Sequence, residues 1–401
     1  MKLTNFTKDT ANAWRARWMS LATSMTFQFN PSLQPRSFVI LGCLAQDEID
    51  DDLLFQILVV LRNELAHFDE TNSQLAISIL MCLKNVVNNL SASSRYLKPM
   101  FWAAISMIQM DHSVIFPHAV KLLHAILRNM DANKFFDRRS IQEVMMAVRA
   151  PFASVMLDID AASGVSFDTQ FSFAVAGTLL KGFQFADARE NVLRCLATFL
   201  EIETKINFTP NRIDARCLGY FAGLLPFAAK NDSLSELLPL AGIIDLNNEM
   251  VTCFSSDVHT AIWRAIDIPN NTTGILLVSF LVGMLSLAEN EAERLFLYGI
   301  LSKAAVSTPE VFALVYESLI PKMSSIVVSS DNVALIEAVK KILITACSEQ
   351  AFSSTERASQ QRRYLENIGF SSFGETNFGS MNTTFSVSAK LTSELLRMIC
   401  E

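Results

Sequence analysis

The sequence predicts an all-α protein, an α-solenoid of stacked antiparallel helix pairs of the HEAT or armadillo kind. Its 401 residues are 51% hydrophobic yet include only 13 Gly and 11 Pro, fewer turn residues than an all-β chain of this length needs. Capped amphipathic segments recur along the chain, and no segment alternates convincingly between apolar and polar residues. Two such helices with their turns occupy about 40 residues, and each pair has an apolar face that only a neighbouring pair can bury.

The first predicted helix carries a stripe of large apolar residues with little polar relief. The stripe consists of Trp14, Trp18, Leu21 and Met25. Terminal units of a solenoid normally need a polar outer face. We therefore expect these four residues to take part in self-association or in contacts with preceding repeats.

Two prolines mark the end of this helix. In the stretch FQFNPSLQPRSFVILGC, residues 27–43, Asn30-Pro31 is expected to end the first helix, because proline disfavours the helical conformation of the residue before it. The next helix is expected to run from Pro35 to Leu44, since proline in a first turn loses no hydrogen bond. The predicted structural corner comprises Asn30, Pro31, Gln34, Pro35 and Arg36.

Arg36 has a predicted role at this corner. Its guanidinium is expected to donate to carbonyl groups left open at the end of the first helix. The alternative is an arginine that contacts a protein partner. Across the same corner, Phe27 and Phe29 are expected to pack on Phe38 and Leu41.

Further along the chain, helix starts are predicted by capping residues followed by apolar stripes. Asp50 to Asp52 precede a stripe that begins at Leu53, where acidic residues favour the N-terminal end of a helix. The capping-box pattern of a cap residue and an acid or amide three positions later recurs. It occurs at Thr71/Gln74, Ser140/Glu143, Asp187/Glu190, Ser233/Glu236 and Ser353/Glu356, and Pro309 marks one more start. Counting such segments predicts about 17 to 19 helices.

Two segments lack the recurring amphipathic pattern and divide the chain into five predicted parts. Residues 231–268 mix short apolar pieces with polar ones, and residues 371–385 are polar. The predicted parts are a first HEAT-like helical array at 1–230, an irregular connecting segment at 231–268, a second helical array at 269–370, a polar linker at 371–385 and a C-terminal helix at 386–401.

Composition excludes several classes of protein. The net charge of −7 and the pI near 5.4 argue against nucleic-acid binding, which needs a sustained basic surface. The seven cysteines include no CxxC pair, which indicates reduced thiols and a cytoplasmic protein. The longest apolar run, residues 274–288, is about 15 residues long against the roughly 20 that cross a bilayer. It predicts a buried helix and no transmembrane segment.

No pattern in the sequence predicts catalysis, a cofactor or a metal ion. The segment GTLLKG, residues 177–182, has the glycine spacing of a phosphate loop, but Phe183 stands where that loop needs lysine. The histidines form no HExxH pair. The acidic residues between Asp47 and Asp52 lack the glycine and the distal glutamate of a calcium loop. The residues alone therefore predict a helical scaffold that binds proteins.

Five segments of the chain carry a family resemblance. They are FQFNPSLQPRSFVILGC from Phe27, FWAAISMIQMD from Phe101, VMMAVRAPF from Val144, FDTQFSFAVAGTLLKGF from Phe167 and YLENIGF from Tyr364. In the same order, they resemble segments in the C-terminal HEAT-like region of neurofibromin and its fungal counterparts, the large Ras GTPase-activating proteins. The resemblance covers about Trp14 to Phe370.

The resemblance implies a cytoplasmic negative regulator of Ras, with helical arms that flank a catalytic domain and support dimerisation. This sequence shows neither the arginine-finger loop nor the FLR helix of that domain, so we expect a non-catalytic piece of the C-terminal arm. The expected partners are other segments of the parent protein or a second copy of it, with Ras involved only indirectly and membranes reached only through partners. The alternative is a free-standing HEAT-repeat adaptor for another protein assembly.

Overall fold

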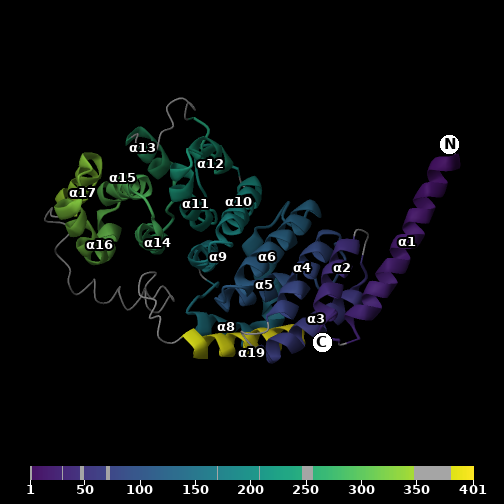
Figure 1. Ribbon diagram of the computed structural model, residues 1–401. Helices are drawn as coiled ribbons and strands as arrows, with labels where there is room; N and C mark the ends of the chain where they lie inside the picture. The colour runs from purple at the N-terminus through teal and green to yellow at the C-terminus, as the bar shows by residue number, and fades with distance from the viewer. Residues whose placement is uncertain are drawn as a thin grey trace. The chain divides into compact units, whose positions relative to one another are not determined.

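The computed structural model describes residues 2–28, 30–45, 49–68, 73–168, 170–206, 208–245, 256–346 and 381–401. In these ranges the chain forms eighteen α-helices and short 3-10 helices but no β-strand (Figure 1). Strand-like pairing there is limited to isolated bridges such as that between Ile213 and Ile266. The predicted all-α fold is confirmed, and the helices pack on their neighbours as in an α-solenoid.

Contacts divide the chain into two compact units. The first unit comprises Met1–Ser163, Gln184–Cys195 and Gly379–Glu401. Its helices are α1 (Lys2–Thr26), α2 (Gln34–Leu44), α3 (Asp51–Ala66), α4 (Gln74–Asn88), α5 (Pro99–Gln109), α6 (Ile115–Ala132), α7 (Ile141–Arg149), η2 (Ala150–Phe152), α8 (Ala153–Ser163) and α19 (Met381–Cys400). Within it α2 packs on α4, α4 on α6 and α5 on α6, so each layer covers the one before it.

The second unit comprises Gly164–Phe183 and Leu196–Phe378. Its helices are α9 (Phe171–Leu180), η3 (Lys181–Gln184), α10 (Arg189–Ile206), α11 (Leu218–Lys230), α12 (Leu234–Leu240), α13 (Ser256–Ala265), α14 (Asn271–Leu287), α15 (Glu291–Ser307), α16 (Pro309–Ser329) and α17 (Val333–Ala346). η3 and α10 each contain residues assigned to both units. The two units are defined by contacts between residues and do not test the five parts predicted from the sequence, which stay a prediction.

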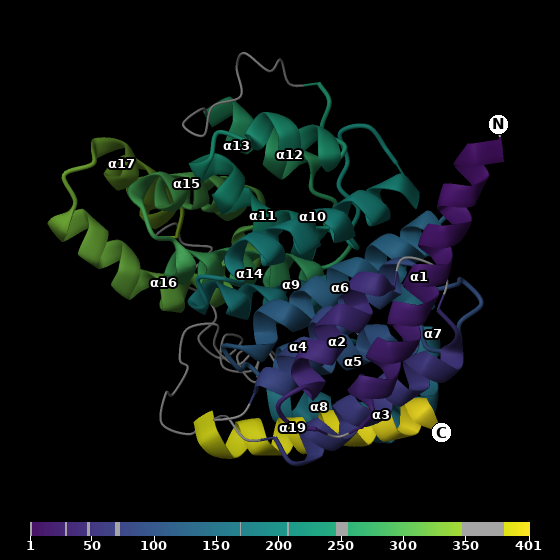
Figure 2. The same ribbon diagram turned by 45° about the vertical axis from the view of Figure 1, so that its right-hand side comes forward.

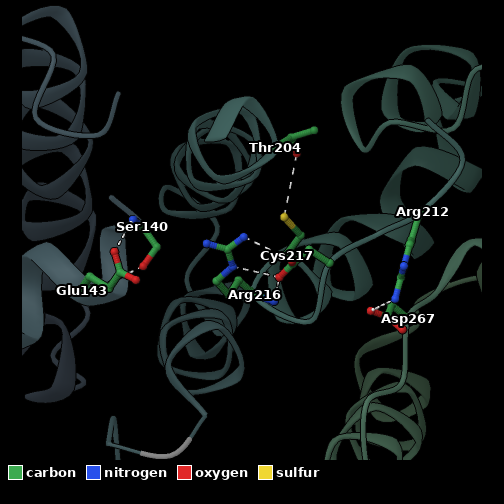
Figure 3. Close-up of polar contacts among 8 residues, drawn as sticks. Ser140, Glu143, Thr204, Arg212, Arg216, Cys217 and Asp267 are labelled. Atoms are coloured by element: carbon green, nitrogen blue, oxygen red, sulfur yellow. Dashed lines mark hydrogen bonds and ion pairs between the residues drawn. The ribbon is translucent and has the colours of Figure 1, made fainter. Parts of the chain in front are cut away.

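Side-chain caps begin several helices. Ser140 Oγ accepts from Glu143 N at 3.1 Å, and Ser140 N donates to Glu143 Oε2 at 3.2 Å, which is the predicted capping box (Figure 3). Asp50 Oδ1 accepts from Leu53 N at 2.8 Å at the start of α3. The caps predicted at Thr71 and at Ser353/Glu356 involve residues outside the described ranges.

Side-chain caps differ from the sequence-based expectation at the starts of α12 and α15. Ser233 precedes α12 without forming a side-chain cap. A capping box that the sequence analysis missed lies at the start of α15, where Asn290 Oδ1 accepts from Glu293 N at 2.9 Å. Glu293 is almost fully buried, and its Oε2 accepts from Glu289 N at 2.6 Å. The helix start and the packing of α15 are therefore coupled through one carboxylate.

The predicted buried apolar run forms helix α14. Its residues Leu276, Val278 and Leu281 are fully buried, and α14 packs on α11, α15 and α16. Among the helices that the structure describes, none combines the length and the hydropathy that a bilayer crossing requires.

Helices α9 and α11 touch backbone to backbone at one glycine. A Cβ atom added to Gly219 would lie 2.4 Å from the carbonyl carbon and oxygen of Ser172. Such a distance is shorter than any real Cβ contact, so only glycine permits this approach. One turn further along α11, a Cβ on Gly223 would meet only side-chain tips, the nearest being Leu180 Cδ1 at 3.4 Å.

Alanine at these two glycines should therefore have opposite effects. We expect Gly219→Ala to lower the free energy of unfolding by about 1 to 3 kcal/mol, because the backbones must separate. Gly223→Ala should be neutral or stabilising by less than about 1 kcal/mol, since alanine favours the helix. Both variants make the same change in helix propensity, so the difference between their denaturant midpoints isolates the close approach. Equal midpoints would contradict it.

Candidate protein-interaction surface

The exposed face of α1 is the candidate functional site. Trp14, Trp18, Leu21 and Met25 have exposed fractions of 58%, 55%, 47% and 38%. Their spacing of four, three and four residues places them on one side of the helix. Exposed aromatic and apolar residues that gather on one face indicate a protein-interaction surface. We call these four residues the α1 stripe.

The C-terminal half of α1 is anchored to the first unit. Ala22 and Thr26 are buried, and α1 packs on α2. Phe27 meets the ring of Phe38 edge to face, with centroids 6.2 Å apart, as the sequence analysis expects, while Phe29 lies outside the described residues. The N-terminal half of α1 extends beyond α2 (Figure 1). The α1 stripe therefore lies on a helix that is held at one end.

Arginines flank the α1 stripe. The guanidinium carbon of Arg17 lies 5.9 Å from the centre of the Trp14 ring, within the range of a cation–π contact. Arg15 lies beside Trp14 in the sequence, and residues 13–26 include no Asp or Glu. The described face is therefore apolar with a positive edge near its N-terminal end.

The corner after α1 is built by Asn30 and Gln34. Asn30 Oδ1 accepts from Ser32 N at 3.1 Å, and the Asn30 carbonyl accepts from Gln34 N at 2.8 Å. Gln34 is buried, and its Nε2 donates to the Thr26 carbonyl at 3.0 Å. Pro31 lies in the turn, and Pro35 lies in the first turn of α2. A carbonyl at the end of α1 thus receives its hydrogen bond from the corner.

The hydrogen bond that the structure shows from this corner to the end of α1 comes from Gln34, and the donor role expected for Arg36 stays a prediction. Helix α2 buries Gln34, Ser37, Phe38 and Leu41, which are spaced as one helix face. Arg36 lies two residues from Gln34 and falls on the exposed side with Ile40. Helix α2 begins at Gln34, one residue earlier than expected, and Gln34 lies on its buried face. The apolar periodicity of residues 34–41 is the signal that identifies this face.

A second polar cluster, before α11, lacks a reactive nucleophile. Cys217 Sγ lies 3.9 Å from Thr204 Oγ1, and Arg216 Nε donates to Asp214 Oδ1 at 2.9 Å (Figure 3). Burial, with the nearby Glu203 carboxylate, raises the pKa of the Cys217 thiol to about 12. A thiol with such a pKa holds almost no thiolate at neutral pH and is a poor nucleophile. This cluster orders the turn before α11, and Arg212 with Asp267, 2.7 Å apart, ties the same turn to the segment after α13.

Other titratable groups in the described residues offer no assembled site. Burial raises the pKa of Cys82 to about 12. His118 and His124 lie on α6 with pKa values lowered by partial burial and then by neighbouring cations. No group of His, Cys, Asp and Glu suited to a metal ion occurs among the residues searched. The α1 stripe therefore remains the strongest candidate for function.

Comparisons with known proteins place the chain beside two yeast proteins. No family model matches it. It is 21% identical over 366 residues to Inhibitory regulator protein IRA2 of Saccharomyces cerevisiae, covering 88% of this chain and 12% of that protein. It is also 21% identical over 248 residues to Inhibitory regulator protein IRA1 of the same yeast, covering 59% of this chain and 8% of that protein.

The similarity confirms the relationship expected from the five segments, namely to fungal counterparts of neurofibromin. The chain spans only about an eighth of the length of IRA2. The activity of the whole relative is therefore not a property of this chain by similarity alone.

Substitutions at the corner should separate Gln34 from Arg36. We expect Gln34→Ala to lower the free energy of unfolding by about 1 to 3 kcal/mol, because the buried Thr26 carbonyl loses its donor. Arg36→Ala should change it by less than about 0.5 kcal/mol, as is usual at exposed positions. Denaturant melts of the two variants, two residues apart on one helix, provide the comparison. A larger loss at Arg36 than at Gln34 would contradict the assignment.

Proposed function

We propose that this chain is a non-catalytic helical scaffold arm of a neurofibromin-like Ras regulator, and that it self-associates through the α1 stripe. The relatives that support the regulatory context are named inhibitory regulator proteins. The observation that carries self-association is the exposure of Trp14, Trp18, Leu21 and Met25 on one face of a helix held at one end. The proposed partners are a second copy of this chain or other segments of its parent protein, in the cytoplasm, with Ras involved only indirectly.

The spacing of the α1 stripe suits a second α1 helix. Residues that alternate by four and three positions keep one seam facing a partner helix, as in a two-stranded coiled coil. A second copy would cover two tryptophans, and tryptophan is among the residues that contribute most to protein–protein affinity. In an antiparallel pair centred on the stripe, Trp18 would lie opposite Leu21 and Trp14 opposite Met25. Sulfur–aromatic contacts of the latter kind are favourable.

Charge favours the antiparallel orientation. Arg15 and Arg17 lie near one end of the α1 stripe. A parallel pair would bring these arginines beside their copies, and like charges repel. An antiparallel pair would move the copies apart along the axis and put Arg15 and Arg17 beside the uncharged residues Ser24 and Ala22. We therefore propose a two-fold antiparallel pair of α1 helices.

We propose a non-catalytic role because the chain offers no residue suited to catalysis of the GTPase-activating kind. The sequence carries no arginine-finger loop of the GTPase-activating kind. The buried thiols are held in their neutral forms. A scaffold role needs no reacting group and is consistent with a chain whose conspicuous exposed residues are apolar.

Self-association should depend on the α1 stripe. We expect Trp18→Ala to raise the dissociation constant of the pair by roughly 30-fold, the effect of losing one interface hot spot. Trp14→Ala/Trp18→Ala should abolish pairing through the α1 stripe over a roughly hundredfold range of protein concentration. Sedimentation velocity measures both. If the chain without substitutions is monomeric over the same concentration range, the proposal is contradicted.

Two controls test whether association is specific to the α1 stripe and whether the two α1 helices are antiparallel. Leu157 on α8 is 59% exposed, so Leu157→Ala is a matched control for Leu21→Ala and should leave the dissociation constant unchanged. In a Cys43→Ser background, spin labels on Ala13→Cys should lie about 20 Å apart along the axis of an antiparallel pair, from the helical rise per residue. Labels in lateral contact would indicate a parallel pair.

The chain by itself should not accelerate GTP hydrolysis by Ras. An arginine finger contributes on the order of 10³ to 10⁵ in rate, and this sequence lacks that loop. We expect a single-turnover assay with micromolar chain to give the intrinsic rate of Ras, while a GTPase-activating domain serves as the positive control. An acceleration of roughly tenfold or more would show catalysis and overturn the scaffold assignment.

A further inference from the structure

The C-terminal helix α19 packs into the first unit, beside helices more than 200 residues earlier in the sequence. It contacts α3, α5 and α8 (Figures 1 and 2, yellow). Its buried face includes Ala389, Thr392, Leu396 and Ile399, which are spaced by three, four and three residues. Lys390 lies on the exposed side. Helix α19 therefore packs as an amphipathic helix on α3, α5 and α8, and we call the surface of these three helices that it covers the groove.

Hydroxyl groups fix the register of α19 in the groove. Thr392 Oγ1 donates to the Ser388 carbonyl at 2.9 Å and lies 2.6 Å from Ser106 Oγ of α5. A threonine hydroxyl has one hydrogen, so Ser106 is the donor to Thr392. Both residues are at least 99% buried. Ser393 Oγ donates to the Arg62 carbonyl of α3 at 2.9 Å. The groove thus recognises a helix with two adjacent hydroxyl residues beside an apolar seam.

We propose that the groove formed by α3, α5 and α8 is a helix-binding site that also accepts α19 from a second copy of this chain. Residues 347–380, 34 in number, separate α17 from α19. A segment of that length spans at most about 110 to 120 Å, several times the radius of a compact domain. The covalent connection therefore does not fix which copy receives α19.

Every contact that α19 makes with α3, α5 and α8 is available in a second copy, because the copies are identical. Exchange of one element between identical chains is a low-cost route to dimers. The balance between the two arrangements depends on protein concentration, since the arrangement within one chain is favoured by its effective concentration. This link between copies uses a different surface from the α1 stripe and does not depend on the proposed function.

Cysteine pairing in mixtures of full chains tests the exchange. The background carries Cys43→Ser, which removes an exposed thiol, and Trp18→Ala, which weakens pairing through α1. Chains with Ser106→Cys are mixed with chains with Thr392→Cys, incubated at high concentration and oxidised with oxidised glutathione. The thiolate at 392 forms a mixed disulfide with one half of oxidised glutathione and releases the other half as reduced glutathione. The thiolate at 106 then attacks the sulfur of residue 392, which forms the disulfide between chains and releases the bound glutathione in its reduced form.

The expected result is a covalent dimer that contains one chain of each kind and grows with protein concentration. Mixing Ser106→Cys with Lys390→Cys is the matched control, because Lys390 lies on the exposed side of the same helix. We expect at least roughly tenfold less dimer from the control, since only random encounters bring its thiols together. Equal yields in the two mixtures, or no dimer at any concentration, would overturn the exchange.

A second measurement covers the case in which a cysteine variant folds poorly. Sedimentation velocity compares the Trp18→Ala chain with the Trp18→Ala/Leu396→Asp chain, in which a charge disrupts the α19 seam. Loss of a concentrated-sample dimer in the second chain supports exchange, and an unchanged dimer fraction contradicts it. Pairing through α1 is weakened in both chains, so failure of the proposed function and failure of the exchange remain distinguishable.

Discussion

The structure depends on one constraint, that an amphipathic helix of ten to twenty residues cannot bury its apolar face alone. In each unit the constraint is met by neighbours in alternating order, as α2 packs on α4 and α4 on α6, and as α13 packs on α15 and α15 on α17. The covered faces are apolar, and side chains such as Asp50, Ser140 and Asn290 accept hydrogen bonds from backbone N–H groups where helices begin. Stability therefore accumulates from layer to layer and does not come from a single central cluster.

Two helices meet this constraint in unusual ways, and both carry the interactions that we propose. Helix α1 buries only part of its surface on α2 and leaves two tryptophans in solvent. Helix α19 buries its apolar face on α3, α5 and α8, which lie more than 200 residues earlier in the sequence. In a fold of local contacts, an uncovered helix and a helix with distant contacts are the natural places for interaction between chains.

Much of the fold follows from local sequence. Apolar periodicity and the capping box at Ser140 and Glu143 identify helices because both act within four residues. The corner after α1 follows from its prolines, but Gln34 was not considered as a donor there, although the apolar periodicity of residues 34–41 places it on the buried face of α2. The capping box at Asn290 was missed although its Glu293 stands three residues later, as the pattern requires. The composition of α1 indicates its exposed apolar side. The packing of α19 on the first unit could not be predicted, because Thr392 and Ser106 are 286 residues apart and no periodic pattern in the sequence relates them.

The distant seat of α19 has a consequence for synthesis on the ribosome. Helices α3, α5 and α8 emerge before the helix that covers them, which lies more than 200 residues later in the chain. At about 5 to 20 residues per second, the groove stays open for roughly 10 to 50 s of translation. During that interval the faces of α3, α5 and α8 that α19 covers have no helix over them. Completion of the first unit is thus timed by translation of the second.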